Sequence, residues 1–135
     1  MKTLALLAGV LATLVLGSAR AATSAPVVRY VDDQFGPVLA TPKKQALYTW
    51  NVEKDFKIHC KGSCAKLWPP LVVRSKAAVP ARIARIKGTF GTIRRPDGRL
   101  QVTYNRRPVY TYVHEGPTQV LCDNVDGWFV VRLRG

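Results

Sequence analysis

The sequence predicts a mainly β protein, namely a small antiparallel β domain built from two related repeats, with at most one or two short helical turns. Three observations predict it. Short apolar runs alternate with polar residues at strand period, Gly- and Pro-containing turns separate these runs, and one aromatic phrase occurs twice. Short strands divided by such turns are typical of antiparallel β domains.

The aromatic phrase occurs at residues 47–50 (Leu-Tyr-Thr-Trp) and again at residues 109–112 (Val-Tyr-Thr-Tyr). In both copies a Glu follows the Tyr by five residues, a Cys follows it by twelve, and a Trp opens a later apolar stretch. The matched residues are Tyr48, Trp50, Glu53, Cys60 and Trp68 in the first copy and Tyr110, Tyr112, Glu115, Cys122 and Trp128 in the second. Self-similarity is the signature of repeat architectures. It favours a scaffold or binding module over an enzyme with one asymmetric pocket.

The first repeat spans about residues 27–73 and begins with strand-like segments. Residues 27–30 are expected to form a short strand. Residues 38–40 and 45–52 are expected to form a hairpin around a Thr-Pro-Lys-Lys turn. Period-two alternation in the second arm puts three side chains on one face, those of Tyr48, Trp50 and Val52.

The first repeat ends in a short helical turn and a returning strand. Residues 62–67 suit one helical turn, which the Trp-Pro-Pro sequence at 68–70 would stop. The β-branched residues at 71–73 then favour a strand. Residues 74–88 form a basic connection whose apolar spacing does not separate a strand from a short helix.

The second repeat, about residues 89–133, begins with the clearest hairpin. Its arms are residues 90–94 and 100–104, joined by Pro96-Asp97-Gly98. This tripeptide combines a fixed φ, a side chain that caps its own backbone and a residue tolerant of positive φ. The sequence therefore predicts a tight turn here.

A turn at residues 105–108 then leads to a strand at 109–113, and a last strand covers residues 128–133. Alternation in this last strand places Phe129, Val131 and Leu133 on one face, and Trp128, Val130, Arg132 and Arg134 on the other. We expect this strand to be half-buried.

The N-terminus is typical of an export signal. Lys2 supplies a positive start, residues 4–16 are almost wholly apolar, and residues 19–21 (Ala-Arg-Ala) fit a signal-peptidase site. A bilayer span needs about 20 apolar residues, so this segment is short for a membrane anchor. We therefore expect residues 1–21 to be a signal peptide, cleaved near Ala21, and the mature protein to be periplasmic or secreted by a bacterium.

The mature chain, residues 22–135, is expected to form a single domain with a strong positive charge. It would have 114 residues and a net charge of +11, from 19 basic and 8 acidic residues. Between residues 74 and 107 ten basic residues accompany one acid, Asp97. These basic residues are Arg74, Lys76, Arg82, Arg85, Lys87, Arg94, Arg95, Arg99, Arg106 and Arg107.

A dense positive field attracts anions and speeds their encounter. In a bacterial envelope the candidate anions are lipid phosphates, anionic glycans, teichoic or sialic acids and extracellular DNA. A protein partner is a further candidate, and lipid phosphates would give peripheral membrane contact. Export separates the chain from the genome, so no physiological nucleic acid is expected. The alternative is a solvated face that maintains solubility. The oligomeric state is open.

An ordered set of segments carries a resemblance to a known family. The segments are residues 47–53, 60–64, 67–71, 91–98, 101–104, 108–110 and 127–131. In them the chain resembles the bacterial "secreted repeat" family, a tandem repeat of exported proteins and predicted lipoproteins with a Tyr-x-aromatic-x-x-Asp motif. The motif positions here are Tyr48, Trp50, Glu53, Tyr110, Tyr112 and Glu115. The resemblance implies export and a β-rich repeat, and it implies no particular chemistry.

The chain departs from the family pattern at three points. Glu replaces the motif's Asp at Glu53 and Glu115, the lipid-anchoring Cys is missing, and Cys122 is added. The longer carboxylates weaken the case for a tight metal geometry. Export without a lipid anchor fits a free periplasmic or secreted protein.

The three Cys are expected to pair in an oxidising compartment. Cys60 and Cys64 would close a small ring, which needs Cα atoms about 5.5 Å apart. Either of them paired with Cys122 would instead tie the two copies together. The resemblance favours Cys60–Cys64, and the Cys left over would be buried and inert, intermolecular or reactive.

A metal site is the alternative use of the same residues. His59, Cys60 and Cys64 from one copy, with His114 and Cys122 from the other, offer ligands that suit copper or zinc. The Cys-x3-Cys spacing is not a standard zinc-knuckle spacing, and oxidised Cys cannot bind as thiolates. We therefore predict no cofactor and no metal, with copper or zinc as the alternative.

Further chemistry finds little support. Four aromatic residues of the repeated phrase could form an exposed platform for sugar rings: Tyr48, Trp50, Tyr110 and Tyr112. Such residues are more often part of a strand core. Glu53 and Glu115 could form a glycosidase-like pair, although turn capping or pairing with basic residues is the simpler role. Neither His lies in a recognisable nucleophile motif, and there is no phosphate loop.

We therefore expect an exported, non-enzymatic binding protein that recognises an anionic envelope component or protein partner through its basic surface. The first alternative is a periplasmic redox or metal-handling protein using the His and Cys residues. A small hydrolase using Glu53 or Glu115 is the third hypothesis.

Overall fold

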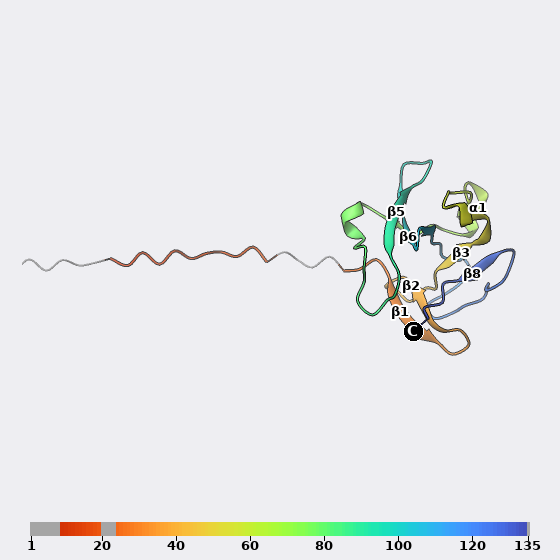
Figure 1. Ribbon diagram of the computed structural model, residues 1–135, viewed down its shortest axis with the longest axis horizontal. Coiled ribbons are helices and arrows are strands. Elements are labelled where there is room, and N and C mark those ends of the chain that lie inside the picture. Colours follow the sequence, from red (N-terminus) through yellow and green to blue (C-terminus); the bar gives the residue numbers. More distant parts are fainter. Residues whose placement is uncertain (1–8, 20–23, 135) are drawn as a thin grey trace, which may run out of the picture.

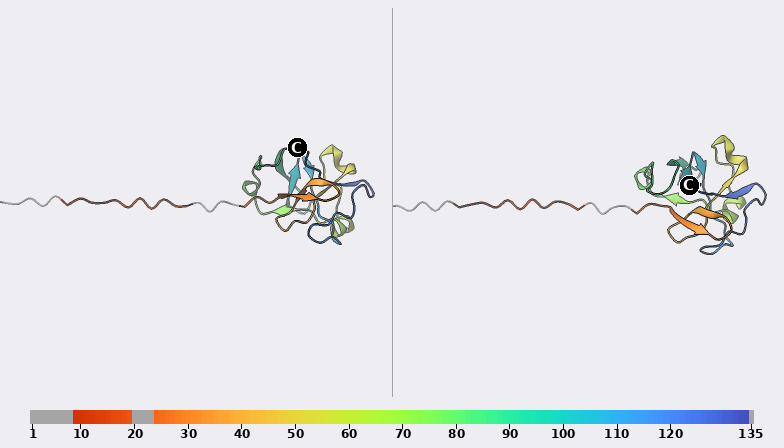
Figure 2. Two further views of the ribbon diagram at one scale, coloured as in Figure 1. Left: turned by 90° about the horizontal axis from the view of Figure 1, so that it is seen from below. Right: turned by 60° about the horizontal axis from the view of Figure 1, so that its bottom comes forward.

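The computed structural model describes residues 9–19 and 24–134, and its ribbon is shown in Figure 1. Residues 9–19 run away from the folded body as an extended segment, which both turned views in Figure 2 also show. Within the described ranges, no helix is long and apolar enough to cross a bilayer. The proposed cleavage point, Ala21, lies outside the described residues.

The body is mainly β, and every strand pairing in it is antiparallel. The strands are β1 (Val28–Asp32), β2 (Gly36–Ala40), β3 (Tyr48–Trp50), β4 (Val72–Val73), β5 (Phe90–Arg94), β6 (Leu100–Tyr104), β7 (Arg107–Pro108) and β8 (Trp128–Val130). One sheet joins β1 to β2, a second joins β3 to β8, and a third has the order β4-β6-β5 with β7 also on β6. The predicted antiparallel β class is confirmed.

The helical content consists of short turns. These are α1 (Ser63–Leu67) and the 3₁₀ turns η1 (Asn51–Asp55) and η2 (Lys76–Ala78). The turn α1 lies where the sequence predicts it and ends at Leu67, after which come Trp68 and two prolines. In the basic connection, η2 is followed by a loop closed by an Ile83–Ile86 bridge.

The hairpin of β5 and β6 forms as predicted. The Arg95 N–H donates to the Arg99 carbonyl at 2.8 Å, and the Gly98 N–H donates back to the Arg95 carbonyl at 2.9 Å. Gly98 has a φ of +86°, and the Asp97 carboxylate accepts the Arg99 N–H. The turn residues therefore act as their chemistry requires.

The predicted hairpin of residues 38–40 with 45–52 is only partly correct. One bridge joins Ala40 to Ala46, but β2 pairs mainly with β1, and β3 pairs with β8 from the other end of the chain. The carboxylate of Asp32 accepts two N–H groups of the intervening turn, so β1 and β2 form the true hairpin. The strand β3 ends at Trp50, because the chain enters η1 and leaves Val52 53% exposed.

Two apolar clusters share the central strands. Leu39 and Leu47 belong to one cluster, whereas their neighbours Val38 and Tyr48 belong to the other. Successive side chains of a strand point to opposite faces. The segments around β2, β3 and β8 therefore separate two cores, and each contributes alternate residues to both.

This arrangement corrects the expectation that the last strand is half-buried. Val131 and Leu133 pack in one cluster, but Trp128 and Val130 on the other face are also buried, in the second cluster. Only beyond the strand does the second face become exposed, at Arg132 and Arg134. A strand between two cores needs apolar residues on both faces, which the alternation rule for a solvated sheet does not anticipate.

Candidate anion-binding site

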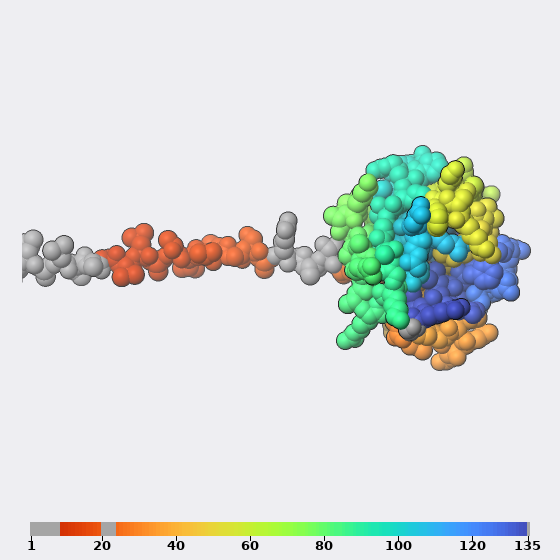
Figure 3. Space-filling view, viewed as in Figure 1, coloured from red at the N-terminus to blue at the C-terminus, as the bar shows by residue number. Residues whose placement is uncertain are grey.

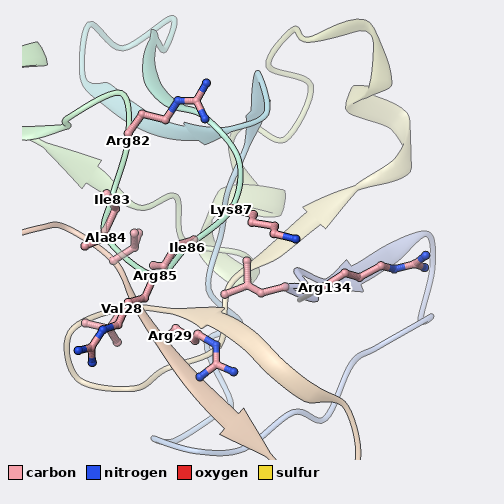
Figure 4. Close-up of a pocket in the computed structure, with 11 residues that line it drawn as sticks. Val28, Arg29, Arg82, Ile83, Ala84, Arg85, Ile86, Lys87 and Arg134 are labelled. Atoms are coloured by element: carbon pink, nitrogen blue, oxygen red, sulfur yellow. The ribbon is translucent and has the colours of Figure 1, made fainter.

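A groove of about 790 Å³ lies between the start of β1, the loop of residues 82–87 and the C-terminal residues 133–134 (Figure 4). Its charged lining residues are all basic: Arg29, Arg82, Arg85, Lys87 and Arg134. Figure 4 shows these side chains distributed around the groove rather than on one side. The volume falls in the range of small-molecule pockets, about 300 to 1,000 Å³.

The floor of the groove is aliphatic. Val27, Ile86 and Leu133 are 1%, 8% and 5% exposed and belong to one core cluster, against which Ile83 also packs. The groove therefore lies over the outer layer of that core, and Val28 and Ile83 are the floor residues that remain partly exposed beneath the cations. We call the five basic residues the rim and Val27, Val28, Ile83, Ile86 and Leu133 the floor.

Among the residues that the structure describes, the rim cations have no acidic counterpart. No described acid lines the groove, and none of the five rim residues forms an ion pair with a described residue. Like charges held together in this way focus a positive field over the groove. An anion placed there would meet little internal competition.

The loop geometry explains why three of the cations face outward. The Ile86 N–H donates to the Ile83 carbonyl at 3.1 Å and closes a tight loop, and Arg85 within it has a φ of +66°. Ile83 and Ile86 turn toward the core, and Arg82, Arg85 and Lys87 are exposed. In Figure 3 this part of the chain, in green, forms one edge of the body.

Two rim residues, Arg29 and Arg134, lie outside residues 74–107, so the local density of basic residues does not predict them as part of the site. Arg29 lies in β1, where burial alternates along the strand, and Arg134 follows Leu133, whose N–H donates to the Pro37 carbonyl. They lie near opposite ends of the folded part of the chain, far in sequence from the loop of residues 82–87. Only tertiary pairing of their segments brings them together, so no local pattern marks them.

The other predicted basic residues are divided among several environments. Arg74, Arg94 and Arg99 line a smaller hollow of about 510 Å³ beside β4 and the hairpin of β5 and β6. Arg99 pairs with Asp97 at 2.8 Å, and Arg94 donates to the Gly98 carbonyl. The remaining exposed members are Lys76 in η2 and Arg106, whose guanidinium lies 4.1 Å from the centre of the Phe56 ring.

Arg95 and Arg107 lie outside the cationic groove, although Arg95 contributes to a separate hollow of about 320 Å³ beside Lys66. Arg95 is 4% exposed and donates to the Gln101 side chain at 2.7 Å and to the Cys60 carbonyl at 2.8 Å. Arg107 is half-buried and donates to the Trp50 carbonyl at 2.8 Å. Both guanidinium groups are used inside the fold.

The motif Tyr and Glu residues form a buried, reciprocal arrangement. The Tyr48 hydroxyl donates to Glu115 at 2.5 Å, and the Tyr110 hydroxyl donates to Glu53 at 2.9 Å. Each Glu also accepts backbone N–H groups from the segment after it: His59 and Cys60 for Glu53, and Leu121 for Glu115. The two phrases therefore exchange partners across the centre of the molecule.

The Glu pair has a structural role in this arrangement. Glu53 and Glu115 are 0% and 6% exposed, so neither lies in an open cleft. Burial raises the pKa of Glu115 above its ordinary value, against the opposing effect of its hydrogen bonds from Tyr48 and Leu121. Burial and the neighbouring carboxylate raise the pKa of each partner Tyr, so both hydroxyls keep their protons.

The aromatic residues of the motif are mainly core. Tyr48 and Tyr110 are fully buried, while Trp50 and Tyr112 are half-buried. The rings of Trp50, Trp128 and Trp68 are stacked, with Trp128 between the other two at 5.2 and 4.0 Å. This stack fills the second cluster and does not present an open platform.

The candidate metal ligands are placed separately. Cys60 and Cys64 form the disulfide that the resemblance favours, with Cα atoms 5.2 Å apart, and Cys122 is a buried free thiol. His59 pairs with Asp55 at 2.7 Å, and His114 packs edge-on against Tyr112. Within the described parts of the chain, no three His, Cys, Asp or Glu residues are grouped as metal ligands.

Comparison with family models, curated proteins and solved structures finds no match to this chain.

Proposed function

We propose that this chain is an exported, non-enzymatic binding protein that recognises an anionic component of the bacterial envelope through the cationic groove. The observation that carries the proposal is the rim itself. Five basic side chains surround one groove with no acid among its lining residues. The export signal predicted from residues 1–21 would place the groove where anionic lipids and glycans are abundant.

The physical basis is electrostatic attraction between an anionic ligand and the rim residues, which form no ion pair with a described residue. Arg29 comes from β1, Arg134 from the C-terminal segment beyond β8, and the other three from one loop, so the fold gathers charges that the sequence separates. Near an anionic membrane surface each Lys or Arg contributes about 1 kcal/mol of attraction. Three such residues therefore account for about 3 kcal/mol, or about a 100-fold change in affinity.

A redox or metal-handling role is the alternative, and it has less support. Two of its sulfur atoms are joined in the Cys60–Cys64 disulfide, and the third, in Cys122, is buried. Neither imidazole is placed beside these sulfurs by a hydrogen bond. A protein partner in place of a lipid or glycan is tested directly in the experiment below.

The test compares two triple variants that lose the same charge. One replaces Arg82, Arg85 and Lys87 with Gln, and the matched control replaces Lys43, Lys54 and Lys57, which are exposed and lie outside the groove. Sedimentation of each protein with isolated bacterial envelope fragments is measured at low and at high salt. We expect the groove variant to bind about 100-fold more weakly at low salt and the control to bind like the wild type.

The outcomes separate the hypotheses. Equal losses in both triple variants would show that net charge alone governs association, and the proposal would fail. Loss of wild-type binding after protease treatment of the fragments would identify a protein partner. Retention after that treatment would support a lipid or glycan.

A further inference from the structure

Besides its cationic rim, the groove has one feature that a plain anion site does not need, namely an aliphatic floor. A free inorganic anion would use only the rim and would leave the apolar floor in water. The rim side chains Arg82, Arg85 and Lys87 are exposed rather than buried, so they do not form a closed cage for a small ion. The floor therefore indicates a ligand with an apolar part.

The floor also discriminates among ligands with an apolar part. Its residues are Val, Ile and Leu, and no aromatic residue lines the groove. Nucleic-acid bases bind best where they stack on aromatic rings. The two aromatic residues of the main core, Phe90 and Tyr104, are not among the residues that line the groove. A flexible hydrocarbon chain suits aliphatic side chains, because burial of apolar area is non-directional.

The position of the floor strengthens this reading. Val27, Ile86 and Leu133 belong to the same cluster as Leu39 and Val102, so the bottom of the groove is the outer layer of the main core. A chain lying on it would extend that core. A head group at the mouth would meet the rim, whose side chains Figure 4 shows around the groove.

We propose that the groove binds a single-chain anionic amphiphile, with the hydrocarbon chain on the floor and the phosphate or carboxylate head among the rim cations. This inference rests on the proposed function and names the ligand class of the same groove. The ligand is taken as a monomer, because the groove volume of about 790 Å³ is that of a pocket for one small molecule.

The experiment measures binding of alkyl phosphates below the concentrations at which they aggregate. Calorimetry compares hexyl, octyl, decyl and dodecyl phosphate, with inorganic phosphate as the head without a chain and dodecyl maltoside as the chain without a charge. We expect affinity to rise by about two- to fourfold per methylene group. Inorganic phosphate and dodecyl maltoside should each bind far more weakly than dodecyl phosphate.

Variants assign the two parts of the ligand to the two parts of the groove. Ile83→Ser alters a partly exposed floor residue, and Leu121→Ser is its control, at an apolar residue that is 58% exposed and lies outside the groove. The floor variant should reduce the gain per methylene group, and the control should not. Val28→Ser is the second floor variant, used if Ile83→Ser does not fold as judged by circular dichroism.

Three results would overturn the inference. Affinity independent of chain length, or equal competition by inorganic phosphate, would leave a simple anion site and spare the proposed function. Binding to vesicles of phosphatidylglycerol without binding of monomeric dodecyl phosphate would indicate docking on lipid head groups at a bilayer surface, and would reject the monomer site. If the groove triple variant and the control triple variant both kept wild-type envelope binding, the proposed function itself would be rejected.

Discussion

Tyr48 and Tyr110 face each other in an antiparallel bridge in which the backbone N–H of each donates to the carbonyl of the other, at 2.8 and 3.0 Å. Their side chains then diverge to the Glu of the opposite phrase, Glu115 for Tyr48 and Glu53 for Tyr110. Neither Tyr hydroxyl donates to the Glu of its own copy. Each buried Glu therefore depends on the other half of the chain for its Tyr donor.

This reciprocity predicts the effect of removing either hydroxyl. Tyr48→Phe and Tyr110→Phe should each lower the free energy of unfolding by about 1.5 to 3 kcal/mol, because a hydrogen bond to a buried carboxylate is lost. Urea denaturation followed by Trp fluorescence measures the change. The matched control is Tyr30→Phe, since the Tyr30 hydroxyl has no hydrogen-bond partner among the described residues. Its substitution should not lower the free energy of unfolding, because it removes a buried hydroxyl that has no hydrogen bond to a described residue to lose.

The same experiment tests whether the two halves fold together. Both Tyr variants should unfold in one transition, because each hydroxyl links residues from different halves. Two separate transitions, one unchanged by each substitution, would contradict the coupling of the two halves.

How far the sequence predicts this fold depends on whether a feature is local. The β5–β6 hairpin is encoded in Pro96-Asp97-Gly98 and could be predicted, because the turn chemistry lies within the turn. The pairing of β3 with β8 joins the two ends of the domain and leaves no local signal, so a nearer hairpin was expected instead. The same limit applies to the groove. Arg82, Arg85 and Lys87 stand out by charge density, whereas Arg29 and Arg134 join them only through strand pairing.

Glu115 predicts a pH dependence of stability with a definite sign. Its pKa in the folded chain is raised by burial above the ordinary 4.5, so the folded state holds this proton more tightly than the unfolded state. The corresponding stability is fully present below the unfolded pKa and is lost as the pH rises through the folded pKa. Relative to the wild type, Glu115→Gln should therefore gain stability as the pH rises from about 4 to about 8.

Asp97 provides a control, because its effect on the free energy of unfolding should change with pH in the opposite direction to that of Glu115. Its hydrogen bond from the Arg99 N–H lowers the pKa of its carboxyl, so its contribution is present at higher pH and is lost as the pH falls through the folded pKa. Relative to the wild type, Asp97→Asn should therefore lose stability as the pH rises. Denaturation at several pH values measures both differences, and equal slopes for the two variants would contradict the assignment to Glu115.

Cys122 should be a slow thiol in the folded protein. It is 9% exposed, and burial raises its pKa, so little of the reactive thiolate is present near neutral pH. Without reductant, a chromogenic disulfide reagent should detect one thiol per chain, and only after unfolding. An exposed thiol introduced by Lys54→Cys should react at once and serves as the control. Equal rates for the two thiols would show that Cys122 is accessible, and would revive the redox hypothesis.

Arg94 and Arg95 are adjacent and indistinguishable in sequence, yet the fold gives them different roles. Arg94 is exposed and donates to the Gly98 carbonyl within its own hairpin. Arg95 is buried and joins β6 to the disulfide segment, through its bonds to Gln101 and to the Cys60 carbonyl. Arg95→Ala should therefore lower the free energy of unfolding by about 3 kcal/mol or more, because two buried acceptors lose a charged donor.

The matched substitution Arg94→Ala should cost less than about 1 kcal/mol, since its acceptor is exposed to water. Arg95→Lys provides the intermediate case, because an ammonium group lacks the planar fork that reaches both acceptors. Thermal and urea denaturation of the three variants measures the order, which should be Arg94→Ala, Arg95→Lys and Arg95→Ala by increasing loss. If Arg95→Ala proved as stable as Arg94→Ala and instead weakened envelope binding, Arg95 would have to be restored to the anion-binding surface.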